Sequence, residues 1–498
     1  MNRCLALFIA LVLSVSAGAQ PTAADRAATS LLQQAVAVQP EGQHNSLLRA
    51  LRHLKDPDLK PLFEQLADRH HPTLQIHGIL GLAELNDPPR LDLARVALLD
   101  DLAAQSELVS AALDADLLTD DQCLQLLDWS GLDVGARMLI ASKLIAQNKL
   151  ANTDLLVESL QSSRLGRRGM AALLLHHLGD PRGYAELEAL NQSDDPSRDP
   201  VRAMLLGTAM KYNLPGSANW AYAVATEPDV NAGLGLLALR TAMRYGDPRA
   251  AAHWRSTFVA TAEPATRVRL ALTALQLSPF LPADTFDILI QQQDPLLRQM
   301  GKTGQAIARE DPALADATVA LIALQHPIAN RWALSYARKE ASDENALLIL
   351  LGLIDAYERG GDPRSQGQRL DNAVNASQIL FERSPDMAAN LLRPILANPK
   401  TDALLRQGIF LGLIRSQTSG ADAMAQGLPA FDHPDTQSLR LLLMLRGNPT
   451  LTDSQQRDLE LIVRGGGSIE DSLRAQAAWA YLKNTGHHDE VIRAIFRP

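Results

Sequence analysis

Apolar residues recur every three or four positions along almost the whole chain, the spacing that puts them on one face of an α-helix. Leu47, Leu48, Leu51 and Leu54 form one such stripe. Residues 346–357 are apolar on most faces, as expected of a helix packed on both sides. No stretch combines polar–apolar alternation with the β-branched and aromatic residues typical of strands. The pattern predicts an all-α chain of about 28 helices, or about 14 helical hairpins.

The turns between these segments carry a recurrent Asp-Pro pair. An Asp at the N-cap accepts hydrogen bonds from the first amides of a helix, and Pro at the next position lacks the amide hydrogen that would be unpaired there. We therefore expect a helix to begin at each of the nine Asp-Pro pairs, which start at Asp56, Asp87, Asp180, Asp195, Asp199, Asp247, Asp294, Asp311 and Asp362.

In three places the Asp-Pro pair is part of the longer sequence Gly-Asp-Pro-Arg. The glycine is predicted to end one helix in a left-handed conformation, and Asp-Pro to begin the next. The arginines are expected to pair with carboxylates of adjacent repeats. These predicted structural corners consist of Gly179, Asp180, Pro181 and Arg182, of Gly246, Asp247, Pro248 and Arg249, and of Gly361, Asp362, Pro363 and Arg364.

The sequence around the first corner, RRGMAALLLHHLGDPRGYAELEAL (residues 167–190), resembles a HEAT-like repeat of the bacterial type first noted in phycobilin lyases. Residues 231–254 resemble it nearly as well. The resemblance covers about a third of the chain and implies an α-solenoid, a stack of helical hairpins with one long concave surface. Residues 468–495 also fit a tetratricopeptide unit. The resemblance implies no catalytic activity.

Residues 1–19 have the pattern of a cleaved signal peptide: Arg3, an apolar run, and then Ala17-Gly18-Ala19. The alternative is an uncleaved anchor, but the apolar run of about 12 residues is shorter than the roughly 20 that span a membrane. We expect an exported protein, in the periplasm or secreted, with no transmembrane segment in the mature chain. Only Cys123 remains after cleavage, and its apolar neighbours predict a buried thiol.

Polar breaks at residues 193–199 and 360–368 suggest a division of the mature chain. Residues 20–195 and 196–365 are predicted to form N-terminal and central HEAT-like repeats. Residues 366–498 are predicted to form C-terminal helical repeats and a cap.

Composition narrows the possible functions. The chain has 498 residues with 47 Lys and Arg against 56 Asp and Glu, a formal net charge of −9. This acidic balance argues against nucleic-acid binding, which requires a surplus of cations. Only 5 Trp, 7 Tyr and 9 Phe occur, few for a groove that stacks sugars or bases.

A search for chemical motifs yields little. No phosphate-binding loop, nucleophile elbow or His-Glu-x-x-His pattern occurs, and the adjacent histidine pairs point about 100° apart on a helix. No catalytic, cofactor-binding or metal-binding residue is therefore predicted. The densest basic cluster, Arg164, Arg167 and Arg168, is the candidate partner-binding site, with a solvated helix face as the alternative. The aromatic group Tyr212, Trp220 and Tyr222 is read as packing, with a ligand platform as the alternative.

These observations favour an exported helical-repeat scaffold that binds protein partners through its concave surface, for example in a cell-envelope assembly. An alternative is an α/α-toroid enzyme acting on a polysaccharide, which would need two facing carboxylates in a cleft. A third possibility is a carrier of a small ligand. No cofactor is expected.

Overall fold

The computed structural model describes residues 21–38, 42–150, 152–416, 418, 420–447, 451–466 and 469–496. The predicted signal peptide lies outside these residues. The described chain contains 29 α-helices, five short 3₁₀ helices and no β-strand, which confirms the all-α prediction. Nowhere in these described ranges does a helix combine the length and the hydrophobicity needed to cross a membrane.

The chain forms two compact units. Unit 1 comprises Met1–Gln122 and Ala373–Pro498, so that it contains both ends of the chain, and unit 2 comprises Cys123–Asn372. This division follows contacts in space, whereas the predicted boundaries near residues 195 and 365 concern groups of repeats. The three repeat groups stay a prediction.

Unit 1 is built from helices that pack on their neighbours in sequence. In its first part α4 packs on α5, and α5 also contacts α3 and α7; in its second part α25 packs on α27 and α28 on α29. The helices are α2 (Ala23–Val36), α3 (Gln43–Arg52), α4 (Lys60–Ala67), α5 (Pro72–Leu85), α6 (Leu93–Val96), α7 (Leu102–Asp114), α24 (Pro385–Ala397), α25 (Ala403–Ser416), α26 (Ala421–Gln426), α27 (Pro434–Leu445), α28 (Asp453–Val463), α29 (Asp471–Thr485) and α30 (His488–Ile495), with the 3₁₀ helix η1 (Pro57–Leu59).

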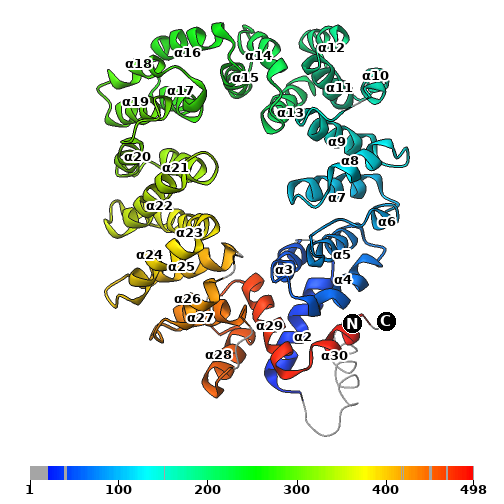
Figure 1. Cartoon of the computed structure of the whole chain (residues 1–498), viewed down its shortest axis with the longest axis vertical. Coiled ribbons are helices and arrows are strands. Elements are labelled where there is room, and N and C mark those ends of the chain that lie inside the picture. Colours follow the sequence, from blue (N-terminus) through cyan, green and yellow to red (C-terminus); the bar gives the residue numbers. More distant parts are fainter. Residues whose placement is uncertain are drawn as a thin grey trace. The chain divides into compact units, whose positions relative to one another are not determined.

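The two ends of the chain meet inside unit 1. Helix α29 packs against both α2 and α3, and α2 also contacts α28 and α30, as Figure 1 shows for the blue and red helices. Trp479 of α29 is buried in this contact, and its indole Nε1 donates a hydrogen bond of 2.9 Å to Asp56 Oδ2. The last hairpin is thus packed against the first helices.

Unit 2 repeats one packing scheme. Helices α9, α11, α13, α15, α17 and α19 contact one another in succession, and the helices between them pack on the same row. The helices are α9 (Val134–Ala146), α10 (Asp154–Ser159), α11 (Leu165–His177), α12 (Pro181–Asn191), α13 (Arg198–Lys211), α14 (Ala218–Ala225), α15 (Ala232–Arg244), α16 (Pro248–Ala260), α17 (Pro264–Gln276), α18 (Asp287–Ile290), α19 (Pro295–Ala308), α20 (Leu314–Ile322), α21 (Pro327–Lys339) and α22 (Asp343–Glu358), with η2 (Pro215–Ser217), η3 (Ser278–Phe280), η4 (Ala283–Phe286) and η5 (Pro363–Ser365). Helices α8 (Asp120–Asp128) and α23 (Gln366–Arg383) cross the boundaries between the units. The fold is all-helical and repeat-like.

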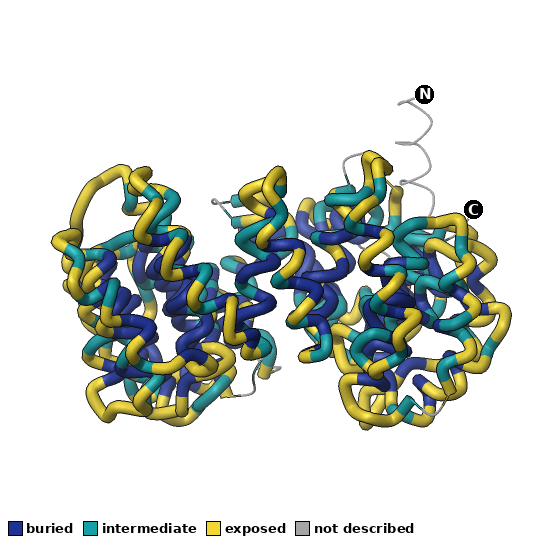
Figure 2. The backbone as a smooth tube through the Cα atoms, turned by 90° about the horizontal axis from the view of Figure 1, so that it is seen from above, coloured by how far each residue is buried: buried dark blue, intermediate teal, exposed yellow. Residues whose placement is uncertain are grey.

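The distribution of buried residues follows the packing of the helices. The buried residues run along the helices, and exposed residues gather at the turns (Figure 2). A few large side chains anchor the interior, among them Trp220, Trp254 and Phe410, each at most 1% exposed. Cys123 is completely buried, as its apolar neighbours predicted.

The Gly-Asp-Pro-Arg corners have a common geometry. Gly179 and Gly246 end α11 and α15 with φ of +83° and +76°, a backbone conformation that glycine adopts without strain. Asp180 and Asp247 then cap α12 and α16 by accepting hydrogen bonds of 2.9 Å from the second amide beyond each of them. At the third corner Asp362 caps the 3₁₀ helix η5, which continues into α23.

Two predictions were wrong, one about the Asp-Pro pairs and one about the corner arginines. Asp-Pro provides the N-cap at Asp56, Asp180, Asp247, Asp294 and Asp362 only. Asp195 and Asp311 cap turns before a helix, by accepting from the amides of Ser197 and Ala313 at 2.8 Å, because a short side chain can cap a turn as well as a helix. Asp199 lies in the first turn of α13, and Asp87 lies between α5 and α6. The corner arginines also pair differently: Arg182 and Arg249 pair with the Asp of their own corner, each at 2.6 Å, and not with a carboxylate of an adjacent repeat. Arg249 does reach α14, where it donates to Asn219 Oδ1 at 2.7 Å.

Candidate functional site

The basic cluster predicted from the sequence lies at the start of α11. Two of its three charges are already neutralised: Arg167 pairs with Asp133 at 2.8 Å, and Arg168 pairs with Glu186 at 2.5 Å. Arg164, at the N-cap of the helix, is exposed. The ion pairs tie α11 to the start of α9 and to α12, so that this cluster has a role in packing. A partner-binding role for Arg164 stays a prediction.

A polar groove of about 510 Å³ lies between α12 and α14. Its lining includes two carboxylates, the feature that a polysaccharide-cleaving enzyme would need. Both are engaged in the structure: Glu227 pairs with the buried Arg202 at 2.5 Å, and Glu188 accepts a hydrogen bond from Tyr184 that raises the pKa of this phenol. Trp220, also in the lining, is 1% exposed and donates to Asn191 Oδ1 at 3.3 Å. Each carboxylate of the groove therefore already has a protein partner.

A second polar site gathers side chains from three separate elements of unit 2. We call it the Arg240 surface and define it as Arg240 and Arg244 on α15, Phe280 in η3 and Glu340 at the end of α21. Helix α15 packs on α17, and α17 packs on α21. The guanidinium carbon of Arg244 lies 4.6 Å from the Phe280 ring centre, within range of a cation–π interaction. Phe280 is nevertheless 47% exposed.

The charges of the Arg240 surface are poorly compensated. Burial lowers the pKa of Arg240, and its neighbour Arg244 lowers it further, while Glu340 opposes the shift. Burial raises the pKa of Glu340, although Arg244, Lys339 and Arg240 act against this. The Nε atoms of both α15 arginines are buried without a hydrogen-bond partner among the described residues. Two like charges one turn apart destabilise a helix, so that an added anionic group would be favourable here.

An aromatic pair on α21 lies one turn before Glu340. The rings of Trp332 and Tyr336 stack with centres 5.3 Å apart and planes inclined by 19°. Both residues are buried, and burial raises the pKa of the Tyr336 phenol to about 12. Tyr336 is therefore neutral at any physiological pH, and the stacked rings form part of the buried face of α21.

The Arg240 surface has almost no signal in the sequence. Arg240 and Arg244 lie in the second stretch that resembles a HEAT-like repeat, where two arginines four residues apart interrupt an apolar helix. The four-residue spacing of these two arginines was the one feature of the sequence that could have indicated the site. Nothing local indicated that Phe280 and Glu340 would lie nearby, because their position depends on the packing of the helices between them.

Comparison with protein-family models, with curated proteins and with solved structures finds no match to this chain. The resemblance to HEAT-like repeats therefore stays an expectation from the sequence.

Proposed function

We propose that this protein is an exported helical-repeat scaffold, a HEAT-like α-solenoid that binds a protein partner, and that the Arg240 surface is the main contact. The single observation that carries the proposal is the pair Arg240 and Arg244, partly buried, one turn apart and without full compensation by Glu340. Arginine and aromatic side chains dominate the energetics of protein interfaces. A partner segment with Asp or Glu beside an apolar residue would satisfy both arginines and cover Phe280.

The repeat-like packing of unit 2 supports this role, since stacked hairpins present long surfaces on which a partner can lie. The signal-peptide pattern of residues 1–19 supports export, and a cell-envelope assembly is the setting that we propose. The groove between α12 and α14 does not favour the enzymatic alternative, because both of its carboxylates are engaged.

Crosslinking in cells tests the proposal. The tagged full chain is crosslinked, and the captured proteins are quantified by mass spectrometry for the native sequence, for Arg240→Gln/Arg244→Gln and for Arg255→Gln/Arg298→Gln. The last variant removes the same charge from two exposed arginines on α16 and α19. We expect the first variant to reduce recovery of specific envelope proteins at least tenfold and the control to leave it unchanged. Equal recovery from both variants would rule out the Arg240 surface as the contact.

A further inference from the structure

The groove between α12 and α14 is a cavity of unit 2 that the proposed function does not use. Its volume of about 510 Å³ lies in the range of small-ligand sites. Glu188 and Ala189 of α12 line it, together with Ala223 of α14 and Glu227 just after that helix. None of the described residues that line the groove is a Lys, Arg or His. The groove therefore presents two carboxylates and no cation.

The spacing of the lining residues places them on facing sides of two helices. On α12 they are Tyr184, Glu188 and Asn191, and on α14 they include Trp220 and Ala223. Steps of three and four residues keep each set on one face of its helix. Because α12 packs on α14, the two faces enclose one groove.

Glu227 is held in place by a completely buried arginine. Nη2 of Arg202, which is 0% exposed, donates to Glu227 Oε2 at 2.5 Å. Nη1 of Arg202 donates to Asp199 Oδ1 at 3.2 Å, and Asp199 also pairs with Arg198. In this network two carboxylates balance two guanidinium groups. Since an ionised carboxylate accepts about four hydrogen bonds, Glu227 retains the capacity to accept from a ligand.

Glu188 adds a negative charge that this network does not balance. It accepts a hydrogen bond from Tyr184, and this phenol carries no charge at neutral pH. Arg249 acts electrostatically on the same phenol, but its own charge is paired with Asp247 at 2.6 Å. The groove therefore has a net negative charge.

Three other classes of ligand fit this groove poorly. A sugar would stack on an open aromatic face, but Trp220 is 1% exposed and its Nε1 donates to Asn191 Oδ1. An anion would meet two carboxylates and no cation in the lining. A metal ion would need more ligands, and the described residues contain no group of three or more His, Cys, Asp or Glu side chains that could hold one. An organic cation fits both the charge and the volume.

We propose that the groove binds a primary ammonium group on an aliphatic chain, either a free polyamine or the side chain of a lysine in a peptide. An ammonium group has three donors, which would form charge-assisted hydrogen bonds with Glu188 and Glu227. Its carbon chain would lie against Ala189 and Ala223, whose methyl groups are exposed in the groove. The groove shares no residue with the Arg240 surface, so this site does not depend on the proposed partner contact.

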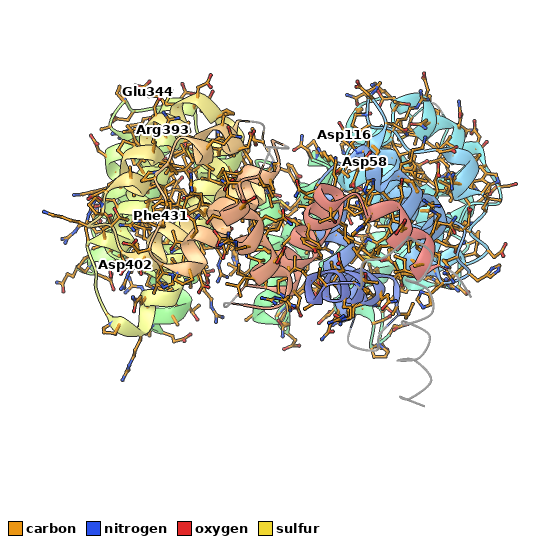
Figure 3. All side chains as sticks on the ribbon, turned by 90° about the horizontal axis from the view of Figure 1, so that it is seen from below. Asp58, Asp116, Glu344, Arg393, Asp402 and Phe431 are labelled. Carbon is orange, nitrogen blue, oxygen red and sulfur yellow. The ribbon has the colours of Figure 1, made fainter. Side chains whose placement is uncertain are left out.

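Titration calorimetry of the full chain tests the proposal at physiological ionic strength. The probes are spermidine and a peptide that has blocked ends and a single lysine. We expect saturable binding, and we expect Glu188→Gln to raise the dissociation constant about tenfold, because it removes a charge-assisted hydrogen bond and keeps the size of the side chain. The control Glu344→Gln removes the same charge from an exposed position on α22, labelled in Figure 3, and should leave the dissociation constant unchanged.

A second pair of variants tests the volume of the groove with its charge unchanged. Ala223→Leu places a larger side chain in the groove, and we expect it to raise the dissociation constant about tenfold or more. Ala185→Leu makes the same change on α12 outside the lining and should bind as the native chain does. Both alanines are exposed, so both variants should fold.

Acetylation of the probes separates recognition of the ammonium group from other binding. We expect fully acetylated spermidine and the lysine-acetylated peptide not to bind. Binding of spermidine alone, or of the lysine peptide alone, would support the site and identify the source of its ammonium group. If neither probe binds saturably, if the acetylated probes bind equally well, or if Glu188→Gln and Ala223→Leu bind as the native chain does, the proposal is wrong.

Discussion

Asp180 and Asp247 each serve two functions at their corners. Each carboxylate caps the following helix by accepting from a backbone amide, and each pairs with the arginine two residues later. Capping is local, so the Gly-Asp-Pro-Arg corners could be predicted from four consecutive residues. The ion pair within the corner was missed, because the sequence does not tell whether an arginine folds back or reaches outward.

Removing the cap at Asp247 should destabilise unit 2. Asp247 is 8% exposed, and the change Asp247→Ala deletes the amide hydrogen bond and leaves Arg249 without its carboxylate. We expect the free energy of unfolding to fall by about 1 kcal/mol. Urea unfolding measures the change. The control Asp194→Ala, at an exposed position, should leave the free energy of unfolding almost unchanged. A similar decrease in both variants would contradict the role of the cap.

Arg202 is the most deeply buried charge among the large side chains of the described interior. It is 0% exposed and pairs with Glu227 at 2.5 Å and with Asp199 at 3.2 Å. Arg202→Met leaves Glu227 unpaired, whereas Asp199 keeps its pair with Arg198 at 3.1 Å. We expect the free energy of unfolding to fall by about 2–3 kcal/mol, because removing one partner of a buried pair costs more than the pair contributes. Arg182→Met, at an exposed position, should lower the free energy of unfolding by less than about 1 kcal/mol. Calorimetry of both variants distinguishes these values.

Helix pairs depend on close contacts that are not apparent in the apolar pattern. The periodicity predicted that residues 167–190 form two helices, but not that Gly183 of α12 lies directly against the backbone of His176 and Ala172 in α11. Side-chain periods indicate which face is buried and give no distance between helices. The contact between Arg244 of α15 and Phe280 of η3 was beyond prediction for the same reason.

The glycine contact can be tested with two matched substitutions. A Cβ atom at Gly183 would overlap backbone atoms of α11, so that Gly183→Ala should destabilise the chain by about 2 kcal/mol. At Gly207 in α13 nothing lies within 4 Å of the added atom, and Gly207→Ala should stabilise it by about 0.5–1 kcal/mol. We expect thermal unfolding to show a lower stability for Gly183→Ala and a higher stability for Gly207→Ala. A loss of stability in both variants would contradict the expected gain from helix propensity at Gly207.

At the scale of the whole molecule, unit 1 joins residues more than 450 positions apart. The hydroxyl group of Tyr481 donates to Asp25 Oδ1 at 3.2 Å, and His487 Nδ1 lies 3.3 Å from the same oxygen. No sequence signal predicted this contact, because local patterns carry no information on which helices far apart in the chain pack together. The class of fold was predictable from periodicity, and this long-range contact was not.

The contact between the ends should weaken in acid. Burial alone would raise the pKa of Asp25 and Asp56, but hydrogen bonds from Thr22 to the first and from Trp479 and Lys483 to the second lower both below 3.8. A carboxylate with a depressed pKa stabilises the folded state above about pH 4, and this contribution is lost as the pH falls through the folded value. We expect faster hydrogen exchange in α2 and α29 below pH 4. Asp25→Asn/Asp56→Asn should show faster exchange at pH 7 and little further change in acid.

The most direct test of the account places a photo-crosslinking amino acid at Phe280 in the Arg240 surface and, in a second chain, at Val259. Val259 is 68% exposed and lies on α16, so it controls for an exposed apolar position. We predict that position 280 crosslinks in cells to a protein whose contact segment contains Asp or Glu, and that Arg240→Gln/Arg244→Gln abolishes this product. Equal labelling from both positions, or a product that persists without the arginines, would contradict partner binding at this surface.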